Sequence, residues 1–173
     1  MNKIGRFIAS LSLAAVTALI HAAPLPTGLG KIAAYAGTWK TQTGHFDTLF
    51  SKAGKDSAII RNHCWRSGNY YACHQYVNGD SKALLVFTYD VKDDSYTVYP
   101  IVAGDDTVQP GKLLIHGNVW TFPWEAQEKG KTTYFRVINI FTAVDTISYR
   151  EEFSMDNIHW FPMAQGFEQK IDK

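Results

Sequence analysis

Turn-forming residues recur at short intervals along most of this chain, and their spacing limits the folds open to it. From Ser51 onward, clusters of Gly, Asn, Asp and Ser stand roughly every 8–12 residues, and the segments between them are rich in β-branched and aromatic residues. Such a pattern is typical of a meander that closes as a barrel or a sandwich. The sequence therefore predicts an all-β fold, a single antiparallel meander barrel of about 8–10 strands, with a short helix over residues 28–36. The clearest strand segments are Ala83–Tyr89, Tyr96–Ile101, Val119–Trp124, Thr132–Thr142 and Ile147–Phe153.

The length and composition of the chain predict a single folded domain. Of its 173 residues, 46% are hydrophobic, which suits a single domain with a full core. Lysine and arginine number 17 against 16 acidic residues, so there is no basic surplus that would bind nucleic acid. Residues 28–33 match a loose dinucleotide-binding pattern, but no strand precedes them, and no other cofactor, metal or nucleophile motif is found. We therefore predict no cofactor and no nucleic-acid partner, and we assign no catalytic residue.

The first 22 residues have the pattern of an export signal. Lys3 and Arg6 precede an apolar run over residues 7–20, and Ala22 offers a small-residue cleavage site. We predict cleavage after Ala22, a mature barrel domain over residues 23–173, and a periplasmic or secreted protein. An uncleaved anchor is the alternative, but a spanning helix needs about 20 apolar residues and this run is shorter. The mature chain has no segment apolar enough to span a membrane.

The two cysteines are predicted to form a disulfide across a hairpin. Gly68-Asn69 is a two-residue turn signal, and pairing outward from it places Cys64 directly opposite Cys73. Alternation of the ladder makes this a non-hydrogen-bonded pair, in which Cα atoms lie about 4.5 Å apart. That separation permits a disulfide, and an exported chain meets an oxidising compartment.

The same register places His63 opposite His74, on the other face of the hairpin. A site that combines both histidines with both cysteines is therefore excluded. The histidine pair alone could share a metal, but no third ligand is evident, so we favour a polar cross-strand pair and predict no metal. We favour the histidine side as the inward face, because aromatic and small residues accompany it. That side carries Arg61, His63, Trp65, Ala72, His74 and Tyr76.

A second hairpin, at Gly117-Asn118, builds an aromatic wall. It places Ile115 beside Trp120, so that Trp120 and Phe122 share one face with apolar residues of the preceding strand. Such a stripe is most simply core. A barrel of this strand number can also hold one small ligand, so Trp120 and Phe122 are candidate ligand contacts as well.

Two other groups of polar residues are not predicted to form catalytic sites. Glu151 and Glu152 are adjacent in a strand segment and point to opposite faces, so they cannot act as a carboxylate pair. Ser154, Asp156 and His159 resemble a catalytic triad in composition only, because they surround a turn that places no base for the serine.

Several motifs, in this order, resemble a known group of barrels. Gly37-Thr38-Trp39 is similar to the G-x-W signature that opens the first strand of lipocalins and related calycin barrels. Further segments resemble a bacterial family of exported lipocalin-like proteins of uncharacterised function: residues 62–65 with 73–75, residues 134–136 and residues 154–160. The resemblance implies a calycin-type barrel in which Trp39 plugs one end. Lipocalins usually pack a late Arg on this Trp, and here the final strand offers Lys170.

Arg136 lies in a long strand with apolar neighbours on its own face, where a guanidinium needs a partner. A turn at Val144-Asp145 would make Glu151 a diagonal neighbour and give an internal ion pair. The alternative is that Arg136 and Tyr134 hold a ligand carboxylate, as fatty-acid-binding members of the calycin group do.

Three functions remain open from the sequence. The first is an exported protein that binds a small apolar or amphipathic molecule through some of Arg136, Tyr134, Trp120, Phe122, His63, His74 and Tyr76. The second is an enzyme that uses the polar Arg61, His63, His74 and Tyr76 cluster inside the barrel. The third is an interaction module with a filled core. A large cavity would favour the first two, and a packed interior the third.

Overall fold

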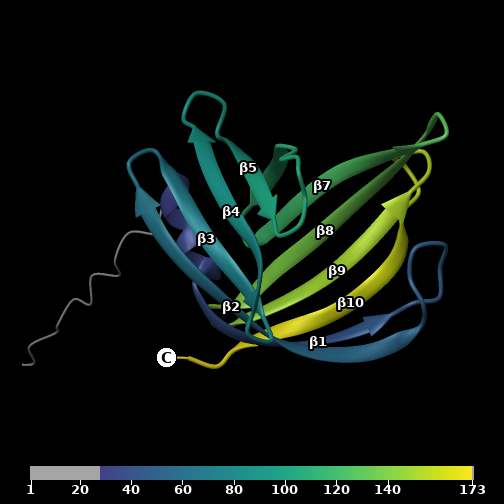
Figure 1. Cartoon of the computed structure of the whole chain (residues 1–173), viewed down its shortest axis with the longest axis horizontal. Coiled ribbons are helices and arrows are strands. Elements are labelled where there is room, and N and C mark those ends of the chain that lie inside the picture. Colours follow the sequence, from purple (N-terminus) through teal and green to yellow (C-terminus); the bar gives the residue numbers. More distant parts are fainter. Residues whose placement is uncertain (1–27, 173) are drawn as a thin grey trace, which may run out of the picture.

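The computed structural model describes residues 28–172, and these form one closed antiparallel barrel of ten strands (Figure 1). The strands follow one another around the barrel in chain order, and β1 closes it against β10. The predicted all-β meander barrel is therefore confirmed, and the predicted short helix is a 3-10 helix. The export segment predicted at residues 1–22 lies outside the described residues. The elements are η1 (Gly28–Tyr35), β1 (Gly37–His45), β2 (Gly54–Ser67), β3 (Tyr70–Val77), β4 (Asp80–Asp90), β5 (Ser95–Val102), β6 (Gly111–His116), β7 (Val119–Glu128), β8 (Lys131–Ala143), β9 (Thr146–Ser154) and β10 (Phe161–Lys170).

Both predicted hairpin registers are confirmed. Cys64 lies opposite Cys73 in the β2–β3 ladder, and Ile115 lies opposite Trp120 in the β6–β7 ladder. A two-residue turn leaves no freedom in how the flanking residues pair, so the turn alone fixes these registers.

One end of the barrel is closed by η1 and by the first strand. The Trp39 side chain is fully buried, and its indole Nε1 donates a hydrogen bond to the carbonyl of Tyr35 at 3.0 Å. The Lys170 ammonium lies 5.4 Å from the centre of the Trp39 ring, so a lysine stands here in place of the late arginine that is usual in lipocalins. Gly37 has a φ of +122°, and a Cβ at this position would collide with the Lys170 side chain. The glycine, the tryptophan and the lysine therefore form one closure at this end.

The cysteine pair forms the predicted disulfide, and its cysteines stand 9 residues apart in sequence. Because the closed loop is short, the disulfide constrains the unfolded chain only modestly. Replacing both Cys64 and Cys73 with alanine should lower the free energy of unfolding by about 2 kcal/mol. Urea unfolding would measure this, and reduction with dithiothreitol should weaken the wild-type protein by a similar amount. A double variant that dithiothreitol weakens further would contradict the assignment of the effect to this bond.

The ten strands do not cover the barrel evenly. Strands β3 to β6 extend over only one part of its length, whereas β7 to β10, β1 and β2 form a long curved sheet that continues beyond them (Figure 1). Residues 54–58 of β2 pair only with β1, and residues 122–128 of β7 pair only with β8. The long sheet thus has two free edges that face each other across an open side.

Candidate functional site

A cavity of about 1230 Å³ occupies the interior of the barrel. It exceeds the roughly 300–1,000 Å³ of ordinary small-molecule sites, so a drug-sized molecule fits inside it. Its lining divides by strand into two arcs, one apolar and one polar. The interior is therefore amphipathic across the barrel.

The apolar arc comes from four strands. Successive inward positions on β4, β5, β7 and β8 place aliphatic and aromatic side chains side by side along the wall. The side chains of this apolar arc are Leu85, Phe87, Val98, Pro100, Phe122, Trp124, Phe135 and Val137.

The polar arc comes from the strands on the opposite side. Strands β1, β2, β9 and β10 are consecutive around the barrel, and most of their inward positions carry hydroxyl or carboxyl groups, although β2 also contributes Ala58 and Ile60. The Tyr149 hydroxyl lies at hydrogen-bonding distance from the hydroxyl of Thr43 and 3.4 Å from that of Thr41. The side chains of this polar arc are Thr41, Thr43, Asp56, Tyr149, Glu151 and Glu168.

Prolines mark the open side of the barrel. The β5–β6 ladder ends at Val98, and the β6–β7 ladder ends at Thr121, in each case two residues before a proline. Pro100 and Pro123 cannot donate a backbone hydrogen bond, and in sheets proline is confined to edges, strand starts and bulges. Both prolines line the cavity, as does Pro110 just before β6. The ladder with β6 therefore stays short, and the cavity keeps a side opening.

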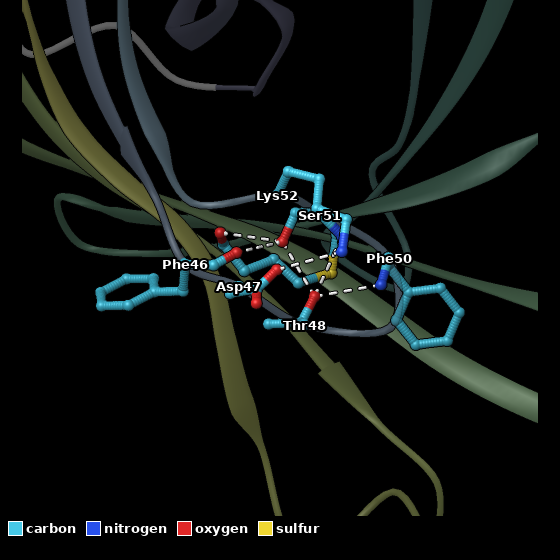
Figure 2. Close-up of polar contacts among 7 residues, drawn as sticks. Phe46, Asp47, Thr48, Phe50, Ser51 and Lys52 are labelled. Atoms are coloured by element: carbon cyan, nitrogen blue, oxygen red, sulfur yellow. Dashed lines mark hydrogen bonds and ion pairs between the residues drawn. The ribbon is translucent and has the colours of Figure 1, made fainter.

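The loop over residues 46–53 follows β1 at the end of the barrel away from η1 (Figure 1). The Thr48 hydroxyl accepts hydrogen bonds from the backbone N–H groups of Phe50 and Ser51, each at 3.0 Å (Figure 2). The Ser51 hydroxyl in turn donates to the Phe46 carbonyl at 2.8 Å. This network holds the Phe50 ring 5.1 Å from the ring of Phe135, which lines the cavity.

Only some of the predicted ligand contacts line this cavity. Phe122 belongs to the apolar arc, and Tyr134 lines the cavity near the turn that joins β7 to β8. Trp120 lies deeper, in the core against η1, where its ring meets that of Tyr35 edge to face at 5.0 Å. For this part of the aromatic wall, the simpler prediction of core is the correct one.

The prediction that the histidine side faces inward is wrong. Asn62, Cys73 and Gln75 line the cavity from the other side of the hairpin. His63, His74 and Tyr76 therefore lie on the outer face, with the Arg61 guanidinium 4.6 Å from the centre of the Tyr76 ring. The physical reason is that the disulfide and two amides fill the interior, while the larger polar aromatic side chains reach solvent. The polar cluster that was considered for an enzyme is thus outside the barrel. Its members are Arg61, His63, His74 and Tyr76.

Arg136 also points away from the interior. Its Nε donates to Glu152 Oε2 at 2.6 Å, and its guanidinium lies 3.8 Å from the centre of the Trp160 ring. The prediction that Glu151 pairs with Arg136 is wrong, because the β8–β9 register shifts between Phe141 and Ala143. The extra residue in β8 moves the pairing by one position, so Glu152 comes to lie opposite Arg136 and Glu151 turns into the cavity.

Ser154, Asp156 and His159, which resemble a triad in composition, form hydrogen bonds that stabilise a loop. Asp156 accepts hydrogen bonds from the Ser154 hydroxyl at 3.0 Å and from His159 Nδ1 at 2.7 Å. The carboxylate thus stands between the serine and the histidine, and Ser154 is fully buried. A nucleophilic serine needs an accessible oxygen next to its histidine base, whereas this oxygen is buried and donates its hydrogen bond to the carboxylate. The hydrogen bonds from His159 are the main reason why the pKa of Asp156 lies below its usual range.

Sequence reasoning missed the inward position of two partly buried carboxyl groups in the polar arc, Glu151 and Glu168. Desolvation raises the pKa of Glu168 to about 7 and also raises that of Glu151. Burial likewise raises the pKa of Tyr35, whose hydroxyl accepts a hydrogen bond from the Asn139 amide at 2.8 Å. Strict alternation along β10 from Gly166 could have indicated that Glu168 faces inward, once the face of that strand was known.

Glu168 should make the protein less stable as pH rises. Burial raises the pKa of Glu168 to about 7, above its ordinary value of 4.5, so the stability that the protonated group allows is complete below pH 4.5 and is lost as pH rises through 7. Glu168→Gln removes this loss. At pH 8 the variant should exceed the wild type by roughly 1–3 kcal/mol in free energy of unfolding, and the gap should narrow towards pH 4.5. Urea unfolding across this range would measure it, with exposed Glu128→Gln as the control. A gap that does not change with pH would contradict the burial of this carboxyl group.

Similarity to known proteins is found among solved structures. The closed antiparallel barrel fits a lipocalin-like fold. No model of a known protein family matches the chain, and no curated protein matches it in sequence. Among solved structures, the chain is similar to the crystal structure of Rv2717c from M. tuberculosis, with 10% sequence identity and a TM-score of 0.48. That match covers 83% of this chain and 97% of the other, and nothing about function is transferred from a likeness at this level.

Proposed function

We propose that this protein is an exported, calycin-type binding protein that holds a small amphipathic molecule inside its barrel. The observation that carries the proposal is the cavity of about 1230 Å³, with its apolar arc and its polar arc on opposite walls. A ligand with an apolar body and a polar end would satisfy both walls at once. The volume also argues against an interaction module with a filled core, because packed interiors contain few voids larger than a water molecule.

Two further observations support export. The N-terminal segment has the composition of a signal peptide, and an intrachain disulfide fits an extracellular or periplasmic protein. In residues 28–172 no helix has the length and the apolar character that crossing a membrane would require.

Binding can be tested with N-phenyl-1-naphthylamine, an uncharged dye that fluoresces in apolar surroundings. The purified protein should enhance its fluorescence, and Val137→Trp, which fills part of the apolar arc, should weaken binding at least tenfold. Ser148→Trp adds the same side chain at an exposed position of β9 and should bind as the wild type does. Ala58→Trp, placed in the mouth beside the free edge of β2, serves if Val137→Trp does not fold. No enhancement by the wild type, or equal binding by folded cavity-filling variants, would overturn the proposal.

A further inference from the structure

The charges that reach the cavity are almost all negative. Among the described residues that line it, Lys112 is the one lysine or arginine, and its exposed side chain stands at the start of β6 beside the mouth. Glu151 and Glu168 project from adjacent strands of the long sheet into the interior. Neither carboxyl group forms a salt bridge within the described part of the chain. Two further acidic side chains line the cavity, but Asp56 is paired with His45 and Glu125 is exposed. Glu151 and Glu168 therefore face the interior without a salt-bridge partner, and His45 is the basic group close enough to act on the pKa of Glu151.

Hydroxyl-bearing side chains lie near Glu168. Thr41 of β1 lies opposite it across the β1–β10 ladder, and the Tyr149 hydroxyl lies 3.4 Å from that of Thr41. Tyr35 of η1 is close enough for the Glu168 charge to raise the pKa of its phenol. These groups can orient a hydrogen-bond donor but supply no positive charge.

The other titratable groups near Glu168 do not neutralise it. Glu151 of β9 lies opposite Ala164, four residues along β10 from Glu168, which corresponds to about 13 Å at roughly 3.3 Å per residue. His45 of β1 is bound to Asp56 of β2 at 2.8 Å. Lys170 of β10 lies over the Trp39 ring at the closed end. A bound group that carries its own positive charge would therefore be the nearest cation to Glu168.

On the basis of the proposed function, we infer that the ligand is a cationic amphiphile, a protonated amine whose ammonium group lies against Glu168 and whose apolar body lies on the apolar arc. An ammonium group has N–H donors for the carboxylate and for the nearby hydroxyl oxygens. The aromatic rings of Phe87, Phe122 and Phe135 on the opposite wall offer an apolar surface to the ligand's chain. A carboxylate ligand would instead face two carboxyl groups of its own sign, because Arg136 lies outside the barrel.

The test compares three ligands with the same chain, decylamine, decanol and decanoate, as competitors of N-phenyl-1-naphthylamine at pH 7.5. We expect decylamine to bind at least tenfold more tightly than decanol, and decanoate to bind more weakly than decanol. Glu168→Gln should bring the ratio of decylamine to decanol affinity close to one. Glu151→Gln should lower it less, because a single ammonium group cannot reach both carboxyl groups, and surface Glu128→Gln should leave it unchanged.

The pH dependence supplies a second measurement. Decylamine affinity should rise with pH up to about pH 7, by at most tenfold per unit, and then level off, because the Glu168 carboxyl group must lose its proton to pair with the amine. This rise should be absent in Glu168→Gln.

The outcomes separate the two proposals. If the dye and decanol bind but decylamine has no advantage, or if folded Glu168→Gln keeps the full advantage, the amine assignment is wrong and the binding function stands. If neither the dye nor any of the three competitors binds, the binding function itself is wrong.

Discussion

Replacing Trp39 with alanine should lower the free energy of unfolding by about 3–5 kcal/mol, the usual range for removing a buried tryptophan. The Trp39 side chain is fully buried at the closed end of the barrel, and the space it leaves is enclosed by η1 and the Lys170 side chain. The change also removes the hydrogen bond from the Trp39 indole to the Tyr35 carbonyl. Within residues 28–172, the Asn62 amide is then the one side chain that still donates to this carbonyl. Urea or guanidinium unfolding, followed by tryptophan fluorescence of the remaining side chains, would measure the loss.

Two other variants isolate the cause of this loss. Trp65→Ala removes a tryptophan that is 39% exposed on the outer face and should cost less than about 1 kcal/mol. Trp39→Phe keeps much of the ring volume but lacks the indole N–H, so it should fall between wild type and Trp39→Ala. A Trp39→Ala protein as stable as Trp65→Ala would show that the plug contributes nothing to the barrel.

Replacing Arg136 with leucine should lower the free energy of unfolding by about 2–4 kcal/mol, because it leaves the largely buried Glu152 carboxylate without its closest cationic partner. The Glu152 side chain is only 11% exposed, and the Arg136 side chain is 27% exposed beneath Trp160. Arg150 still contacts the other Glu152 oxygen at 3.0 Å, which keeps the cost below that of a fully isolated charge. Thermal and urea unfolding at pH 7 would both report the change.

A double variant distinguishes the observed partner from the one first expected. Adding Glu152→Leu to Arg136→Leu should recover part of the lost stability, because no unpaired carboxylate then remains beside the leucine. Adding Glu151→Leu should not recover stability through this pair, because that side chain lies in the cavity on the other face of the sheet. Recovery with Glu151→Leu and none with Glu152→Leu would contradict the observed register.

Local turn geometry explains why part of the fold could be predicted. The turns at Gly68-Asn69 and Gly117-Asn118 each fix a hairpin register, and the disulfide follows from the first of them. The face of that hairpin could not be obtained in the same way, since both of its sides mix polar and apolar residues. Only closure of the barrel decides that Cys73 faces inward and His74 outward.

The candidate site was harder to predict for a related reason. The β8–β9 register depends on one extra residue in β8 near Thr142, and no turn signal in the sequence marks it. That residue decides which of two adjacent glutamates meets Arg136 and which enters the cavity. The inward position of Glu168 likewise depends on how β10 meets β1, a pairing between the two ends of the domain. Long-range register of this kind is set by the closed barrel as a whole.

The prolines on the open side also affect how copies of this protein meet one another. Free strand edges are templates on which a second chain can add a strand, and extended hydrophobic edges are sites of aggregation. The edge of β7 beyond Thr121 carries Pro123 and then Glu125 and Glu128, while the edge of β2 begins with Lys55 and Asp56. A proline cannot complete a new ladder, and charged side chains oppose burial between two sheets. The mouth that exposes the apolar arc is thus framed by residues that discourage edge-to-edge assembly, so the barrel can stay open without joining its neighbours.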